Sequence, residues 1–241
     1  MSELLDGKTI LITGGAKRVG KIFTLACAHA GADVVIHYGH SAQEADATRQ
    51  EVVRLGRQAW VIESDLSDPA QAQNLIPLIN EFTPLHGLVN SAAVFQSLSL
   101  ETTSSEDWQN HLQINLTAPF LLSQTFAKQA PVGARIVNIL DWRALRPGAD
   151  HFPYTISKAA LAALTKSLAV ALAPNVIVNG LALGAILPPS DGKAKTDIIK
   201  NVPAGRWAEQ EEVEQALIFT MTCPAYITGE IIHVDGGRHL V

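Results

Sequence analysis

Residues 8–20 read KTILITGGAKRVG, an apolar strand-like run that enters a glycine turn and then a helix-like segment. A glycine turn at the start of a helix presents free backbone N–H groups and the positive end of the helix dipole, an arrangement that suits a pyrophosphate. Taken alone, the stretch also fits a plain strand-to-helix turn. Its position after the first strand of an alternating chain favours a dinucleotide site.

Outward from this turn, strand-like and helix-like segments alternate to the C-terminus. Several strands are unbroken Val/Ile/Leu runs, which are typical of a parallel sheet covered on both faces. The pattern predicts strands at 8–13, 33–38, 59–63, 86–90, 135–140, 176–180 and 230–234, and helices at 18–30, 42–55, 69–81, 106–129, 152–173 and 209–222. We therefore expect an α/β fold: one doubly wound, Rossmann-type domain spanning residues 1–241, with helices on both faces of its parallel sheet.

Composition narrows the possible functions. The 241 residues are 47% hydrophobic and 17% charged, an ordinary globular balance, and the net charge is −5 without a basic run. Neither nucleic acid nor a membrane surface is an expected partner. Cys27 and Cys223 stand apart among apolar residues, which indicates buried thiols and no metal site. Residues 1–7 do not resemble a signal peptide, and the apolar stretch 159–173 is too short for a membrane span, so we expect a cytoplasmic protein.

The end of the second predicted strand indicates which dinucleotide is bound. A site for NAD usually has an acid there, whereas this chain has His37, Tyr38, Gly39, His40 and Ser41. Lys17 and Arg18 add cations in the glycine turn. Because a 2′-phosphate is repelled by carboxylates and bound by cations, NADPH is favoured over NADH. The alternative is that these are only solvated turn residues.

Tyr154 and Lys158 are four residues apart in a predicted helix, so they project from the same face. An ammonium group beside a phenol can lower its pKa and ease proton donation near neutral pH. The pair begins the helix after the fifth predicted strand, beside the expected nicotinamide. The spacing alone is a weak signal, and its position is what indicates a catalytic role.

With these motifs together, the chain resembles the short-chain dehydrogenase/reductase family. The resemblance rests on the turn 13–20, Asp65, Asn90-Ser91-Ala92, Asn115, Tyr154 with Lys158, and Asp235-Gly236-Gly237, in the family's order. It implies about seven strands, hydride transfer from the nicotinamide, and a homotetramer or homodimer. It further implies that Tyr154 donates the proton, Lys158 holds the ribose and Asn115 supports a relay water. The cofactor contacts implied are Gly14, Lys17, Arg18, Val19, His37, Tyr38, His40, Ser41, Asp65, Leu66, Asn90, Ser91, Ala92, Tyr154, Lys158, Gly184 and Ile186.

Two departures from the family pattern indicate the substrate. Arg18 stands where the family usually has Gly, and Asp141 stands where it usually has Ser. Both changes recur in pteridine reductases and dihydromonapterin reductases, which this chain also resembles in the Ala-Lys-Arg turn, the His-Tyr-x-x-Ser run, Phe95 and the C-terminal stretch 235–240. The resemblance implies that a pterin contacts Arg18, Phe95, Asp141, Tyr154 and Leu187, with residues 184–207 completing the pocket. A carboxyl group can bond pterin nitrogens and help relay a proton.

Each of these residues also has a simpler interpretation. Asp141 could only pair with Arg143 or Arg146, Phe95 could be core packing, and Arg18 could bind only phosphate. Leu183-Gly184 replaces the usual Pro-Gly, and residues 186–189 lack the usual hydroxyl.

The leading hypothesis is an NADPH-dependent reductase of a 7,8-dihydropterin such as dihydromonapterin or dihydrobiopterin, with dihydrofolate as a further candidate. It would send hydride to C6 and a proton to N5. The alternatives are a carbonyl or 3-oxoacyl reductase and a non-catalytic NADPH-binding sensor.

Overall fold

Seven short strands rich in Val, Ile and Leu pair in parallel and form one sheet, as the unbroken apolar runs predict. The structure is a computed structural model that describes residues 4–188 and 196–241. The strands are β1 (Thr9–Ile12), β2 (Asp33–Tyr38), β3 (Ala59–Glu63), β4 (Gly87–Asn90), β5 (Ala134–Asp141), β6 (Val176–Leu183) and β7 (Ile231–Val234).

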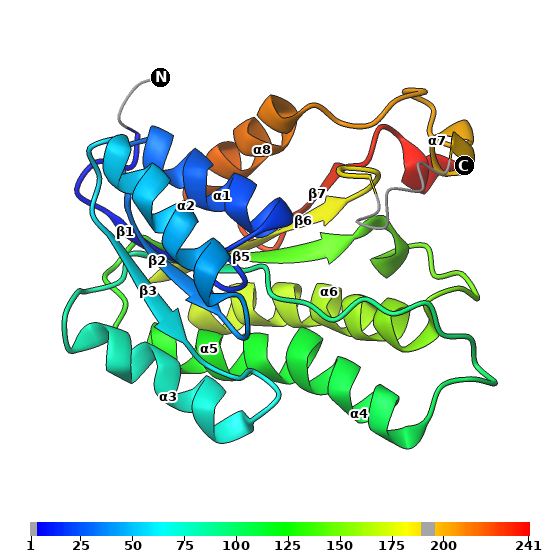
Figure 1. Cartoon of the computed structure of the whole chain (residues 1–241), viewed down its shortest axis with the longest axis horizontal. Coiled ribbons are helices and arrows are strands. Elements are labelled where there is room, and N and C mark those ends of the chain that lie inside the picture. Colours follow the sequence, from blue (N-terminus) through cyan, green and yellow to red (C-terminus); the bar gives the residue numbers. More distant parts are fainter. Residues whose placement is uncertain (1–3, 189–195) are drawn as a thin grey trace.

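Helices cover both faces of this sheet. They are α1 (Arg18–His29), α2 (Ala42–Arg54), α3 (Pro69–Asn80), α4 (Ser105–Leu112), α5 (Ala118–Ala127), α6 (Phe152–Leu172), α7 (Thr196–Lys200) and α8 (Gln210–Thr222). In Figure 1, α1, α2 and α8 lie on one face of the sheet and α3, α4, α5 and α6 on the other. The predicted single doubly wound domain is therefore confirmed.

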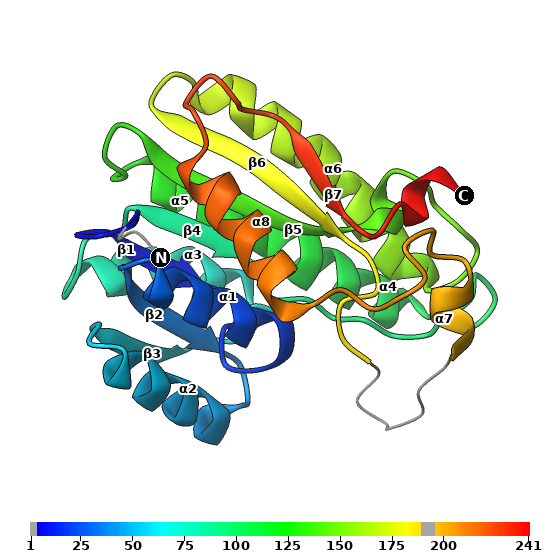
Figure 2. The same cartoon turned by 90° about the horizontal axis from the view of Figure 1, so that it is seen from above.

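The strand order indicates at which end of the sheet a ligand would bind. Neighbouring strands follow the order β3-β2-β1-β4-β5-β6-β7, so the chain reverses its direction across the sheet between β1 and β4. Ligands of such sheets bind beyond the carboxyl ends of the strands at this reversal. Four segments lie at or just beyond the carboxyl ends of strands: the glycine turn, residues 90–95, Asp141 and residues 184–188. Figure 2, viewed from above, shows β5, β6 and β7 side by side, with α8 crossing over the sheet.

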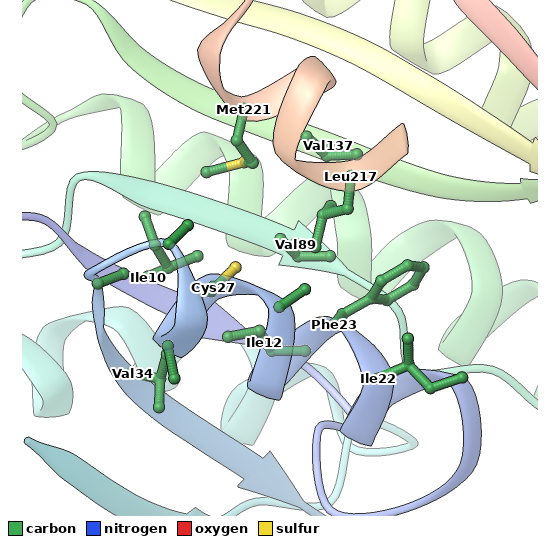
Figure 3. Close-up of a cluster of buried hydrophobic side chains, with 14 of the residues drawn as sticks. Ile10, Ile12, Ile22, Phe23, Cys27, Val34, Val89, Val137, Leu217 and Met221 are labelled. Atoms are coloured by element: carbon green, nitrogen blue, oxygen red, sulfur yellow. The ribbon is translucent and has the colours of Figure 1, made fainter. Parts of the chain in front are cut away.

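Alternation along β1 divides the core between the two faces. Ile10 and Ile12 belong to the cluster between the sheet, α1 and α8, whereas Leu11 belongs to the cluster on the opposite face. Figure 3 shows the first cluster, where Phe23 of α1 and Leu217 of α8 lie above Ile12. Successive side chains of a strand point to opposite faces, so a strand buried on both sides must be apolar throughout.

Several element boundaries differ from the sequence expectation. The predicted helix 106–129 is interrupted by a π-helical turn, η1 (Gln113–Thr117), between α4 and α5. β6 continues three residues beyond the predicted end at 180, because it pairs with β5 as far as Asp141 and Leu183. The segment 184–207, which is expected to complete the substrate pocket, contains the short helix α7, and residues 189–195 of it lie outside the described residues.

The longest helix, α6, begins before the apolar stretch 159–173 and includes most of it. With 21 residues and a mean hydropathy of 1.3, it is long and apolar enough to cross a membrane by length and composition alone. Its buried face carries Tyr154, Lys158 and Leu161 and packs against β5 and β6. That packing is what a core helix of a doubly wound fold shows.

Candidate functional site

The turn between β1 and α1 is too tight for side chains at its glycines. Gly14 adopts a left-handed backbone, with φ of 63°, and a Cβ there would lie 3.0 Å from the Cα of Ala92. A Cβ on Gly20 would collide with the carbonyl oxygen of Gly14. The N-cap residue, Lys17, makes no side-chain cap to α1. The turn therefore offers backbone N–H groups and the positive end of α1 to an anion.

His37 has a different role from the one its sequence position suggested. Its side chain is buried, its Nδ1 accepts from the Gly14 N–H (3.1 Å), and its Nε2 lies 2.9 Å from the Ser64 carbonyl oxygen. Burial lowers the pKa of His37 to about 4, so the ring is neutral at pH 7. With both ring nitrogens engaged inside the protein, the side chain supports the glycine turn and has no free donor for a phosphate. The expected direct contact of this side chain is thereby corrected.

The other residues after β2 remain accessible. Tyr38 and Ser41 are half-buried, and His40, Lys17 and Arg18 are exposed, so these five side chains remain accessible to a phosphate.

The carboxylate of Glu63, which the sequence did not predict at this site, also lies here. Tyr38 donates its hydroxyl to Glu63 at the end of β3 (3.4 Å). The carboxylate of Asp65 accepts from the Ser67 N–H (2.9 Å), and hydrogen bonds from the side chain and then the backbone of Ser67 lower the pKa of Asp65. The Leu66 side chain is buried, and its carbonyl accepts from Gln113. Asp65 and Leu66, two of the expected cofactor contacts, thus stand just beyond the carboxyl end of β3.

The end of β4 is fastened to the glycine turn through one hydroxyl. Thr13 accepts from the N–H groups of both Ser91 (2.9 Å) and Ala92 (3.0 Å). Asn90 is buried and donates to Asn138 on the neighbouring β5 (2.8 Å). These bonds fix the relative position of the two loops that flank the sheet's reversal point. Thr13 belongs to the motif at 13–20, and its hydroxyl connects the glycine turn to the loop after β4.

Asp141, Tyr154 and Lys158 converge at the carboxyl end of β5. The Tyr154 hydroxyl donates to Oδ2 of Asp141 at 3.3 Å. Nζ of Lys158 donates to the carbonyl of Ile139 (2.7 Å) and lies 5.8 Å from the centroid of the Tyr154 ring. Tyr154 and Lys158 are both buried, as their position on the inner face of α6 requires. The sequence prediction that these three residues meet is therefore in agreement with the geometry.

Their protonation differs from the expectation at one residue. Burial, and secondarily the adjacent Asp141 carboxylate, raises the pKa of Tyr154 well above 10. The predicted lowering of the Tyr154 pKa by Lys158 is wrong for this structure, because burial of the phenol dominates its pKa and the Asp141 carboxylate acts in the same direction. Burial also raises the pKa of Asp141 and lowers that of Lys158 to about 8. Tyr154 and Asp141 therefore lose their protons less readily than exposed groups of the same kind, and Lys158 loses its proton more readily.

Asn115 occupies the π-helical turn that interrupts the helix. Its side chain accepts from the Val94 N–H (2.8 Å) and donates to the Val94 carbonyl (3.0 Å) and to the Ser157 hydroxyl (3.0 Å). A π-helical turn alters the direction of a helix locally and is common at functional sites. Here it joins the loop after β4 to the catalytic helix, so Asn115 fixes the framework around Tyr154.

Phe95 forms an exposed aromatic wall beside the phenol. Its side chain is 56% exposed, which excludes simple core packing. The ring meets the Tyr154 ring edge-on (centroids 4.7 Å apart) and is stacked on His151 (4.1 Å, interplanar angle 18°). His151 has a left-handed backbone, with φ of 50°, immediately before α6. The histidine covers one face of Phe95 and leaves the wall available to a flat ligand.

Arg18 connects the glycine turn to the loop after β6. Its guanidinium donates to the Pro188 carbonyl (3.0 Å), and its backbone is left-handed, with φ of 51°. Ile186 is buried in the core cluster between the sheet, α1 and α8. Leu187 is partly buried and packs against the same cluster, so only the rest of its side chain can line the site. A Cβ on Gly184 would lie 2.6 Å from the Cα of Asp235, which explains glycine there. Pro189 lies outside the described residues.

Comparisons with known proteins agree with this geometry. A family model described as Enoyl-(Acyl carrier protein) reductase matches residues 14–239. The chain is also 31% identical, over 240 residues, to the 3-oxoacyl-(acyl-carrier-protein) reductase of a Synechocystis strain, with 97% of each chain covered.

The chain belongs to the short-chain dehydrogenase/reductase family.

Solved structures of the family superpose closely on it. FolM Alternative dihydrofolate reductase 1 from Brucella canis, complexed with NADP, gives a TM-score of 0.92 at 30% identity, covering 100% of this chain and 97% of the other. A short chain dehydrogenase from Burkholderia cenocepacia, in complex with NADP, gives 0.91 at 32% identity, covering 97% and 98%.

Asp141 has further partners besides Tyr154. Besides the phenol, Asp141 accepts at Oδ1 from the backbone N–H of Arg143 (2.9 Å) and lies 3.4 Å from its guanidinium. The simpler interpretation, pairing with Arg143, is thus realised together with the contact to Tyr154. Asp150 completes the set by pairing with Arg143 at 2.7 Å.

Asp150 and His151 were not identified from the sequence. Their only signal there is their place directly before the tyrosine helix, and the left-handed backbone of His151 is invisible in a sequence. Among residues 4–188 and 196–241, no group of three His, Cys, Asp or Glu side chains could hold a metal ion.

Proposed function

We propose that the protein is an NADPH-dependent reductase that converts a 7,8-dihydropterin to its tetrahydro form. The observation that carries this proposal is the carboxyl of Asp141, 3.3 Å from the Tyr154 hydroxyl, at a position where the family usually has Ser. The similar FolM protein of Brucella canis, named as an alternative dihydrofolate reductase, supports the same substrate class. Dihydromonapterin, dihydrobiopterin and dihydrofolate are the candidate substrates.

The donor set fits NADPH. The glycine turn and the start of α1 would hold the pyrophosphate, and Lys17, Arg18 and His40 are exposed cations or donors for a 2′-phosphate. The similar structures complexed with NADP support this choice. When bound, NADPH supplies the hydride that adds to C6 of the pterin.

This chain's residues would manage the proton that N5 must receive. Because the pKa values of Tyr154 and Asp141 are both raised, the phenol keeps its proton at neutral pH and the carboxyl is more readily protonated than an exposed one. A protonated carboxyl can donate to a ring nitrogen, directly or through the phenol. Lys158, with its pKa lowered to about 8, can release a proton to the phenol more easily than an ordinary lysine.

Phe95 would bind the flat ring of the substrate. One of its faces is covered by His151, so a pterin would use the remaining surface. Stacking on a rigid aromatic side chain contributes about 0.5–1.5 kcal/mol beyond the area that is buried.

A second candidate function is reduction of a ketone or 3-oxoacyl substrate, which the Synechocystis relative favours. Ketone reduction develops negative charge on oxygen, and a neighbouring carboxylate destabilises that charge unless it is protonated. The carboxyl at position 141 therefore favours the pterin. A non-catalytic NADPH-binding sensor is disfavoured because Asn115, Tyr154 and Lys158 form an assembled set.

The test follows NADPH oxidation by the purified protein with a panel of dihydropterins, dihydrofolate, ketones and 3-oxoacyl thioesters. The proposal expects turnover of a dihydropterin with NADPH preferred over NADH. Turnover confined to ketones or thioesters would refute the pterin assignment, and failure of single-turnover hydride transfer to every substrate would favour the sensor.

Two further proposals accompany this function. We expect the enzyme to act in the cytoplasm on a small-molecule substrate and to assemble as a homotetramer or homodimer. Light scattering at assay concentration tests the assembly, and a monomer would contradict it.

A further inference from the structure

The catalytic carboxyl of Asp141 belongs to a charged triad with Arg143 and Asp150, two residues of the segment between β5 and α6. The Arg143 side chain is 17% exposed and lies between the two carboxylates, whose side chains are 15% exposed for Asp141 and 54% for Asp150. One arginine is therefore shared between a buried acid that contacts the catalytic phenol and an acid at the surface.

The sharing is unequal. A terminal nitrogen of Arg143 lies 2.7 Å from Oδ2 of Asp150, and its Nε lies 3.3 Å from the same oxygen. Towards Asp141 the guanidinium makes one longer contact of 3.4 Å. Since a fork-shaped contact to a carboxylate is stronger than a single long one, the geometry directs the guanidinium mainly to Asp150.

Aromatic packing limits how the guanidinium can move. Its carbon lies 4.7 Å from the centroid of Trp142, and that of Arg238 lies 4.8 Å from the same ring. Arg238 also donates to the Asn201 carbonyl (2.8 Å), and through Trp142 the C-terminal turn contacts the segment that follows β5 in the same chain. The indole thus restrains Arg143 near both acids, which keeps it available to each of them.

Four ionisable groups, from α6 and the segment between β5 and α6, act on the carboxyl of Asp141. Arg143 follows β5, Tyr154 and Lys158 come from α6, and Asp150 acts through Arg143. His151 lies 4.0 Å from Asp150, on the outer side. Burial raises the pKa of Asp141, and contacts with Arg143 are the main opposing influence.

We propose that Asp150 draws the Arg143 guanidinium mainly to itself, weakens its contact with Asp141 and so favours the protonated form of the catalytic carboxyl. Asp150 and Arg143 are then positioning residues of the reaction. This inference deepens the proposed function, since it rests on a proton being handled at Asp141.

The test titrates the Asp141 carboxyl directly by carbon-13 NMR in the free protein, with Asp141→Asn identifying the resonance. In Asp150→Asn the guanidinium is released towards Asp141, so the midpoint should fall by about half a pH unit. In Arg143→Gln the cation is removed, so the midpoint should rise. Asp46→Asn is the matched control, because Asp46 pairs with Arg49 at the same 2.7 Å and is 50% exposed, but lies on α2.

Opposite shifts in the two variants, with none in the control and recovery in Asp150→Glu, would support the inference. Shifts in the same direction, or no shift in Asp150→Asn, would overturn it. The alkaline limb of the pH profile for dihydropterin reduction should move as the NMR midpoint does. If the wild-type protein reduces no pterin, the proposed function fails, and the carboxyl titration still decides this inference independently.

Discussion

His37 provides a quantitative test of how the glycine turn is built. The perturbation is His37→Gln, since glutamine can accept from the Gly14 N–H or donate to the Ser64 carbonyl but does not ionise near neutral pH. The folded protein holds the histidine with a pKa of about 4, whereas the ordinary value is 6.5. Between these values the unfolded chain binds more protons than the folded one, so the stabilisation that this group provides is full above pH 6.5 and is lost as the pH falls towards 4.

The magnitude follows from the size of that shift. At 1.36 kcal/mol per pKa unit, the free energy of unfolding should fall by about 2 kcal/mol between pH 7 and pH 5 through this residue alone. Urea unfolding of wild type and His37→Gln at both pH values measures it, because the difference between their pH dependences cancels the contributions of other groups. His40→Gln, an exposed histidine nearby, controls for the loss of any histidine. Equal pH dependence in wild type and His37→Gln would show that the buried, neutral histidine is not what the turn depends on.

Three further outcomes follow from the site. Tyr154→Phe should lower dihydropterin turnover by about 100-fold or more while retaining NADPH binding by fluorescence, and near-normal turnover would exclude the phenol as donor. Phe95→Leu should raise the pterin KM about threefold to tenfold with little change in kcat; a change in kcat alone would contradict its role as a wall. Arg18→Gly should raise the free energy of unfolding by about 1 kcal/mol, since it relieves a left-handed non-glycine backbone, and should weaken pterin turnover. Lys17→Gly, where the backbone is extended, should not stabilise the protein, and equal stabilisation by both would refute the strain argument.

The elements of the fold were largely predictable because their signals are local. The apolar run of β1, its glycine turn and the start of α1 are contiguous in sequence, and the alternation of such units implies a parallel sheet. The π-helical turn at Asn115, which separates α4 from α5, was not predictable. The Asn115 side chain is bonded there to the backbone of Val94, which lies 21 residues earlier. The extra length of β6 likewise depends on pairing with β5.

The site was predictable where residue type and spacing sufficed, as for Tyr154 and Lys158. It was not predictable where the environment decides the chemistry. The position of His37 at the end of the second predicted strand favoured a phosphate contact, but both of its ring nitrogens are bonded inside the protein, to Gly14 and Ser64. Asp150 matters through Arg143, a contact between two side chains of an irregular loop, and no periodic pattern predicts such a contact.

The central claim is that the carboxyl at position 141 adapts this reductase to a pterin. Asp141→Ser restores the residue usual in the family and tests it most directly, by comparing kcat/KM for a dihydropterin and for a ketone in both proteins. We expect the dihydropterin value to fall by about 100-fold and the ketone value to hold or rise. An unchanged dihydropterin value in a variant that still binds NADPH would contradict the claim.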